Sequence, residues 1–119
     1  MIRGHVNQEG EPIVVLQIEG VDIRTVIDTG FNGDLIQPDY LRSSMYLKWA
    51  GDMRWTLANN TEVVEDMYRT SIEFDGQTGF AEVGFTSSSY GLMGTGFLRH
   101  YQLSIDFIAR TVFVVKSFV

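Results

Sequence analysis

The sequence predicts a small all-β domain, and three observations carry this prediction. Short segments rich in Val, Ile and Phe alternate with Gly, Asn, Asp and Ser, which is the spacing of strands joined by turns. Glycine accounts for 12 of the 119 residues, which suits a closed β-barrel with many turns and bends. A chain of this length buries enough surface for one core, so we expect a single domain over residues 1–119.

The predicted elements follow from this punctuation. Eight strands are expected, at Ile2–Asn7, Ile13–Glu19, Val21–Ile27, Trp55–Ala58, Glu62–Phe74, Phe80–Phe85, Leu103–Phe107 and Val112–Val115. Turn residues at Glu9–Pro12 separate the first two strands, and Asp75–Gln77 separates the fifth from the sixth. Two short helices are expected at Pro38–Ser43, where Pro can occupy the first turn, and at Thr95–His100.

Composition excludes several classes of partner and chemistry. Fifteen acidic against nine basic residues give a net charge of −6, and the basic residues are scattered, so we expect no nucleic-acid partner. The chain has no cysteine, which removes disulfides, thiolate catalysis and Cys-based metal sites. The two histidines, His5 and His100, lack metal-ligand spacing, so neither a metal nor a cofactor is expected.

The start of the chain and its apolar segments bear on location. Met1–His5 lacks the basic leader and apolar region of a secretory signal. No apolar run approaches the ~20 residues that span a bilayer. We therefore expect a cytoplasmic protein with no membrane partner.

The most informative stretch is Val26–Gly30, an apolar strand that runs directly into Asp28, Thr29 and Gly30. A carboxylate at the end of a buried strand is costly unless it is paired or used, because its desolvation is expensive. From these residues alone, an ordinary turn that begins with Asp and Gly explains the stretch equally well.

A second stretch, Tyr90–Leu98, places two large apolar residues before Gly94 and then leads into the expected short helix. Together the two stretches resemble the retropepsin-like aspartic peptidases, which carry hydrophobic-hydrophobic-Asp-Thr-Gly early and hydrophobic-hydrophobic-Gly late in the domain. The resemblance extends from about Pro12 to Val115. Asp28–Phe31 looks particularly like prokaryotic cellular members, in which Phe follows the tripeptide.

The resemblance implies an aspartic endopeptidase that is a homodimer, since the chain carries a single Asp-Thr-Gly. Asp28 would then be contributed twice, across a two-fold axis. Two carboxylates about 3 Å apart repel by roughly 5 kcal/mol at an effective dielectric constant near 20, so they share one proton and titrate as a pair. The ionised member would activate water and the protonated member would donate to the developing oxyanion.

The resemblance also implies roles for the neighbouring residues. The Thr29 hydroxyl would bond across the axis to the partner loop, and Gly30 would let an amide approach the carboxylate. Gly94 would lie behind the catalytic loop, where a side chain would collide with packed backbone. Phe31 and Asn32 would flank the substrate beside the paired Asp28 carboxylates.

A β-hairpin flap over the cleft is a further feature of the resembled family. The flap is expected at 55–67, with Asn59 and Asn60 at its tip and Ala58 beside them, because Asn tolerates the positive φ of a tight hairpin. An exposed hairpin with no functional role is the alternative. The five acids Glu62, Glu65, Asp66, Glu73 and Asp75 are interpreted as a solvated face.

The two functional hypotheses are therefore an active peptidase and an inactive module of the same fold. The first predicts a peptide or protein substrate cleaved between the flaps and the paired Asp28 side chains. The second is a catalytically inactive retropepsin-fold module for peptide binding or dimerisation, because a fold does not by itself establish activity.

Overall fold

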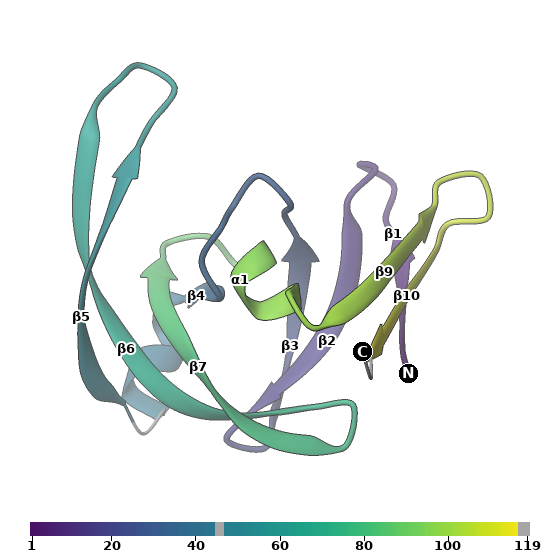
Figure 1. Cartoon of the computed structure of the whole chain (residues 1–119), viewed down its shortest axis with the longest axis horizontal. Coiled ribbons are helices and arrows are strands. Elements are labelled where there is room, and N and C mark those ends of the chain that lie inside the picture. Colours follow the sequence, from purple (N-terminus) through teal and green to yellow (C-terminus); the bar gives the residue numbers. More distant parts are fainter. Residues whose placement is uncertain (45–46, 117–119) are drawn as a thin grey trace.

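The computed structural model describes residues 1–44 and 47–116, and strands dominate this part of the chain (Figure 1). The strands are β1 (Ile2–Val6), β2 (Pro12–Ile18), β3 (Val21–Ile27), β4 (Leu35–Pro38), β5 (Lys48–Thr56), β6 (Glu62–Phe74), β7 (Gln77–Thr86), β8 (Gly91–Met93), β9 (Tyr101–Asp106) and β10 (Thr111–Lys116). A 3-10 helix, η1 (Asp39–Ser44), follows β4, and α1 (Thr95–Leu98) follows β8. The predicted all-β class is confirmed. No helix among the described residues is both long and apolar enough to cross a bilayer.

One predicted strand, Trp55–Ala58, differs clearly from the structure, and β4 and β8 were not among the predicted strands. The strand predicted at Trp55–Ala58 is the end of β5, which begins at Lys48 and stops at Thr56. Gly51 has φ +121° and lies at a shift of register, so it interrupts the period-two pattern that identifies strands. The strand β4 was not predicted, because all four of its residues are buried and no polar alternation marks it.

The two predicted helices are present with different bounds. The helix expected at Pro38–Ser43 is the 3-10 helix η1, and Pro38 itself ends the preceding strand. The helix expected at Thr95–His100 stops at Leu98, because β9 begins three residues later at Tyr101.

The ten strands form one sheet in the order β5-β6-β7-β4-β8-β3-β2-β1-β10-β9. Strand β8 lies between β3, to which it is parallel, and β4, to which it is antiparallel. An additional pairing of β2 with β6 joins β6, β7, β4, β8, β3 and β2 into a ring. Since β3 and β4 lie on opposite sides of β8, the segment that links them passes across the end of β8.

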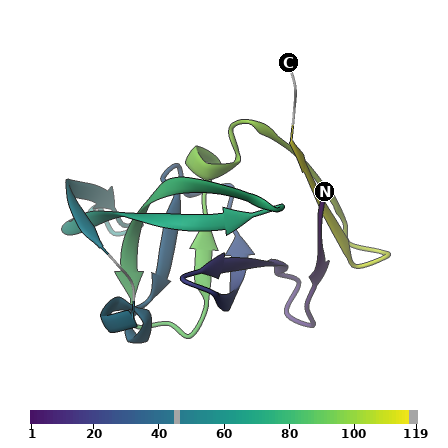
Figure 2. The same ribbon diagram turned by 90° about the horizontal axis from the view of Figure 1, so that it is seen from below.

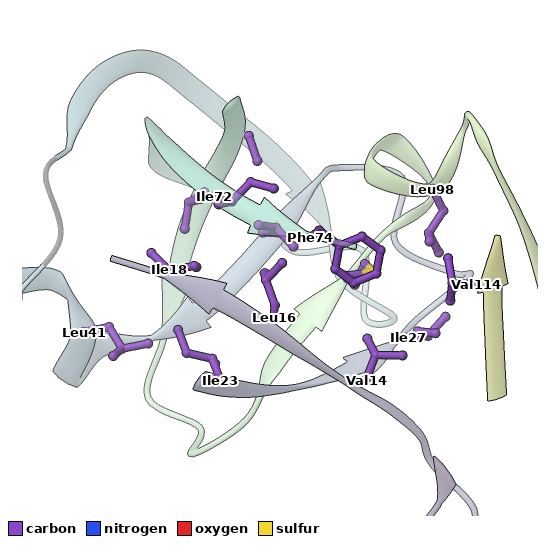
Figure 3. Packing of buried hydrophobic residues seen from close by; sticks show 14 of the residues in the cluster. Val14, Leu16, Ile18, Ile23, Ile27, Leu41, Ile72, Phe74, Leu98 and Val114 are labelled. Atoms are coloured by element: carbon purple, nitrogen blue, oxygen red, sulfur yellow. The ribbon is translucent and has the colours of Figure 1, made fainter. Parts of the chain in front are cut away.

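The core is formed mainly by residues of the ring strands, and β1, β10, η1 and α1 also contribute to it (Figure 3). Strand β2 alternates as expected for a sheet with one buried face, and its residues Val14, Leu16 and Ile18 are each at most 2% exposed. They pack in one cluster with Ile23 and Ile27 of β3. This packing fixes the end of β3, from which the candidate site begins.

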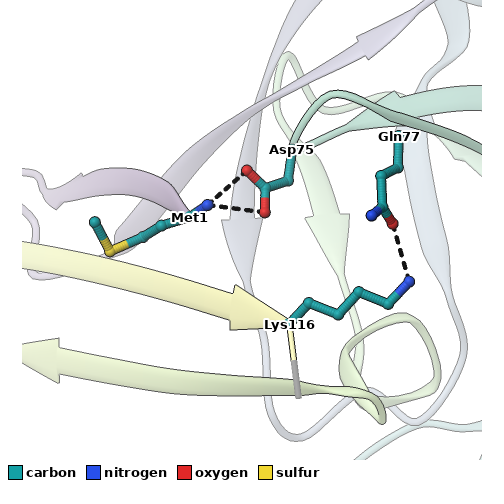
Figure 4. A network of polar contacts seen from close by, with 4 residues as sticks. All are labelled: Met1, Asp75, Gln77 and Lys116. Carbon is teal, nitrogen blue, oxygen red and sulfur yellow. Dashed lines mark hydrogen bonds and ion pairs between the residues drawn. The ribbon is translucent and has the colours of Figure 1, made fainter. Parts of the chain in front are cut away.

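Strands β1, β10 and β9 form a wing that extends the sheet beyond β2 (Figure 2). Val112 and Val114 of β10 are fully buried and attach the wing to the core. Polar contacts at the far end reinforce this attachment (Figure 4). The Met1 amino group lies 2.7 Å from Asp75 Oδ1, and Lys116 Nζ donates to Gln77 Oε1 at 2.9 Å. The first contact reaches the β6–β7 turn, and the second reaches the first residue of β7.

Candidate active site

Asp28 follows the last residue of β3, and its backbone continues the pairing with β8. Its N–H donates to the carbonyl of Met93 at 2.9 Å. Its half-buried carboxylate accepts a hydrogen bond at Oδ1 from the Gly30 N–H, also at 2.9 Å. Among the described residues this is the only hydrogen bond to the carboxylate. The local turn therefore orients the side chain and leaves acceptor capacity for another group.

The residues after Asp28 form an exposed loop tip. Thr29, Gly30 and Asn32 are all exposed. The Thr29 hydroxyl makes no hydrogen bond within residues 1–44 and 47–116. The Asp-Thr-Gly tripeptide thus presents a carboxylate and a hydroxyl at the surface of a single chain.

The segment after β8 holds this loop from behind. The amide of Gly94 donates to the Asp34 carbonyl at 2.9 Å, and the amide of Thr95 donates to the Phe31 carbonyl at 2.8 Å. The amide of Gly96 donates to the Gly33 carbonyl at 3.1 Å. Three hydrogen bonds from successive backbone amides therefore fix the shape of the loop.

Close packing behind the loop confirms the steric role expected for Gly94. A Cβ on Gly94 would overlap the Gly33 carbonyl oxygen and would lie 2.6 Å from both the carbonyl oxygen and the ring of Phe31. Contacts this short do not occur for real Cβ atoms, so the position accepts only glycine without a backbone shift.

Phe31 and Asp34 attach the loop to the interior. The Phe31 side chain is only 7% exposed, so it lies inside the protomer and not on the loop surface. Its predicted role beside the substrate stays a prediction, and within one chain its ring acts by shaping the loop. Asp34 Oδ2 accepts a hydrogen bond from the Glu82 amide at 3.0 Å, which ties the end of the loop to β7.

The expected hairpin is formed by β5 and β6, and its tip has the predicted conformation. The Leu57 amide donates to the Thr61 carbonyl at 2.9 Å, and Asn60 has φ +64°. Asn59 Oδ1 accepts from the Thr61 amide at 3.0 Å. Ala58, Asn59 and Asn60 are exposed at this tip, and Figure 1 shows the hairpin rising on the side of the molecule to which the β3–β4 loop extends. Whether it acts as a flap remains a prediction.

A cavity of about 540 Å³ lies between this hairpin and the strands that carry the loop. Its lining consists of Ile36, Asp39, Leu57, Val63, Glu65, Phe85, Thr86, Ser87 and Leu92. Leu92 is in register with both Val26 of β3 and Ile36 of β4. The cavity wall thus lies one strand position from Met93, whose carbonyl binds the Asp28 amide.

Sequence reasoning missed several of these residues. Asp34, Thr95 and Gly96 hold the loop through hydrogen bonds that each involve a backbone group, and no sequence pattern marks these contacts. Glu65 was assigned to a solvated acidic face, and this interpretation is wrong for that residue because Glu65 lines the cavity. The signal that was available is alternation, since Glu65 lies two residues after Val63 and two before the buried Met67. The described residues contain no group of three or more potential metal ligands.

Three solved structures with similar folds identify the architecture. A retropepsin-like aspartic protease from Rickettsia conorii matches with a TM-score of 0.63 at 17% identity, over 97% of this chain and 89% of that one. Simian foamy virus protease matches with a TM-score of 0.58 at 17% identity, over 73% of this chain and 91% of that one.

EIAV protease, solved with a bound inhibitor, matches with a TM-score of 0.58 at 13% identity, over 78% of this chain and 89% of that one. No protein-family model matches the sequence. No curated protein matches it either. The similarity is therefore one of fold, with little sequence identity.

Proposed function

Because the chain has a retropepsin-like fold, we propose that two copies assemble into a homodimeric aspartic endopeptidase with one Asp28 from each copy at a shared site. The observation that carries this proposal is the Asp28-Thr29-Gly30 loop. The loop is exposed, and three backbone hydrogen bonds from the segment after β8 hold it in place. Its Asp28 carboxylate accepts one hydrogen bond and can accept more. A carboxylate that is held rigidly and can still accept a hydrogen bond from another group is what a catalytic acid or base requires.

The dimer is needed because the chemistry uses two carboxyl groups in different protonation states. Two carboxylates in contact cannot both ionise, so the pair holds one proton. The ionised Asp28 removes a proton from water as the water oxygen attacks the amide carbonyl, and the protonated Asp28 donates to the carbonyl oxygen. When the C–N bond breaks, the nitrogen takes up a proton, giving a carboxylic acid and an amine.

The loop residues support this assembly in distinct ways. In the proposed dimer the exposed Thr29 hydroxyl bonds to the partner loop, and the Gly30 amide orients the carboxylate. Phe31 and Asn32 define the shape of the loop beside the paired acids.

An extended peptide is the proposed substrate. It lies between the loop and the β5–β6 hairpin, where Ala58, Asn59 and Asn60 close over it and the apolar cavity receives one of its side chains. Binding of this kind adds backbone hydrogen bonds as an extra strand would.

The test compares the wild-type protein with the Asp28→Asn variant on an unfolded protein and a peptide library between pH 3 and pH 7. We expect the wild type to cleave and the variant to lose at least about a thousandfold in kcat/KM, since an amide cannot act as the catalytic base. Circular dichroism should show the same fold for both.

Two results would contradict the proposal. Equal turnover by both proteins would place the chemistry elsewhere. Peptide binding without turnover by either would indicate the inactive binding or dimerisation module.

A further inference from the structure

The cavity under the β5–β6 hairpin combines an apolar lining with acidic groups. Its apolar residues are Ile36, Leu57, Val63, Phe85 and Leu92. The charged residues among its described lining are Asp39 and Glu65, and both are acids. A purely apolar side chain of a substrate would pack against the apolar lining, but it would give these two carboxylates no partner.

Glu65 is placed in the cavity by the alternation of β6. Val63, Glu65 and Met67 face inward, while Glu62, Val64 and Asp66 are exposed. The Glu65 side chain is half-buried, between the cavity-lining Val63 and a core methionine that is 3% exposed. Glu65 therefore places a negative charge on the wall of the cavity, and a cationic group of the substrate would complement that charge.

Asp39 supplies the second carboxylate from another element. It is the first residue of η1, directly after β4, so it lines the cavity from the strand that follows the Asp28 loop. Two arginines near these elements have contacts with groups other than the carboxylates of Asp39 and Glu65. Arg42 stacks 4.7 Å from the centre of the Phe85 ring, and Arg54 Nη1 lies 3.2 Å from Glu62 Oε1.

We propose that this cavity selects a lysine or arginine side chain of the substrate. The aliphatic stem packs on the apolar lining, and the cationic end reaches the carboxylates of Asp39 and Glu65. The inference deepens the proposed endopeptidase function and rests on it for the hydrolytic step, but the selectivity of the cavity can also be measured by binding alone.

The test uses matched pairs of extended peptides that carry either lysine or norleucine at each position around a cleaved bond. Norleucine keeps the aliphatic stem and removes the charge. We expect two positions, one on each side of the cleaved bond, at which lysine raises kcat/KM by about fivefold over norleucine, because the two-fold axis gives the dimer two copies of the cavity; fivefold is the upper range for a partly solvated ion pair. Affinity for the non-cleaving Asp28→Asn variant should show the same preference at the same positions.

Variants at the cavity sharpen the test. Glu65→Gln should reduce the preference for lysine, and Glu65→Lys should reverse it in favour of glutamate. Glu73→Gln is the matched control, because Glu73 lies on the same strand, is exposed and does not line the cavity, so it removes the same charge without changing the preference.

The outcomes of these experiments separate the proposed selectivity of the cavity from the proposed peptidase activity. Hydrolysis without a lysine preference at any position, or a preference unchanged in Glu65→Gln, would overturn this inference and leave the peptidase standing. Absence of hydrolysis would overturn the peptidase, and the binding measurement would still decide the cavity. Equal affinity for the lysine and norleucine peptides would then reject the proposed selectivity.

Discussion

Gly94 is the residue at which packing and site geometry constrain each other most tightly. Its missing side chain leaves room for the carbonyl oxygens of Gly33 and Phe31, and its amide binds the Asp34 carbonyl. We expect Gly94→Ala to lower the free energy of unfolding by about 2 kcal/mol or more, because backbone atoms must move to admit the methyl group. Chemical denaturation measures this loss.

Gly79 provides the matched control for that substitution. A Cβ on Gly79 would meet no atom within 4 Å, so Gly79→Ala should change the free energy of unfolding by less than about 0.5 kcal/mol. Equal effects of the two substitutions would show that the close packing behind the loop is not what excludes a side chain at Gly94.

For individual residues, the sequence predicted those features that a short local motif is enough to identify. Asp28 at the end of an apolar strand and Gly94 after two apolar residues are visible as motifs, and the positive φ of Asn60 follows from the chemistry of asparagine. The inward placement of Glu65 was missed, because several acids occur close together and suggest a solvated face. Only the register of β6 against buried Met67 distinguishes Glu65 from its exposed neighbours.

Among the elements, α1 and β9 share an aromatic cluster that makes the stability of the protein depend on pH. The Phe97 and Tyr101 rings are stacked with centroids 6.1 Å apart, and Phe74 meets both edge-on. Burial, and secondarily the negative charge of Asp75, raises the pKa of Tyr101 above its ordinary value of 10.0. The folded protein therefore holds this proton at pH values where the unfolded chain releases it.

The raised pKa of Tyr101 determines how the stability of the protein changes with pH. The contribution of Tyr101 to stability is complete below pH 10 and is lost as the pH rises through the raised pKa. Tyr101→Phe should therefore leave the free energy of unfolding little changed at neutral pH and make its decline above pH 10 less steep. Thermal unfolding between pH 8 and pH 11 measures this, and parallel declines for both proteins would contradict it.

Element prediction succeeded where strands have one solvated face and failed elsewhere. Strands β2, β3 and β6 alternate or form long β-branched runs between clear turns, and their bounds were nearly correct. Strand β4 is buried throughout, and the bulge at Gly51 disrupts β5. In both cases tertiary packing, and not the local pattern, determines the strand.

For the whole molecule, the order of the strands explains how a site of this kind is built. Because β8 lies between β3 and β4, the Asp28 loop crosses the end of β8 and receives its backbone bonds there. The two motifs are more than sixty residues apart in the sequence, so no local pattern predicts that they meet. Only the resemblance to a known family anticipated their proximity.

The central claim is that one catalytic site takes an Asp28 from each of two chains, and subunit mixing tests it most directly. Wild-type chains are equilibrated with an equal amount of the Asp28→Asn variant, and peptide hydrolysis is measured at constant total protein. If heterodimers form at random and are inactive, activity falls to about one quarter of that of the wild-type protein alone. A fall to about one half, in proportion to the wild-type chains present, would show that each chain works alone and would contradict the account.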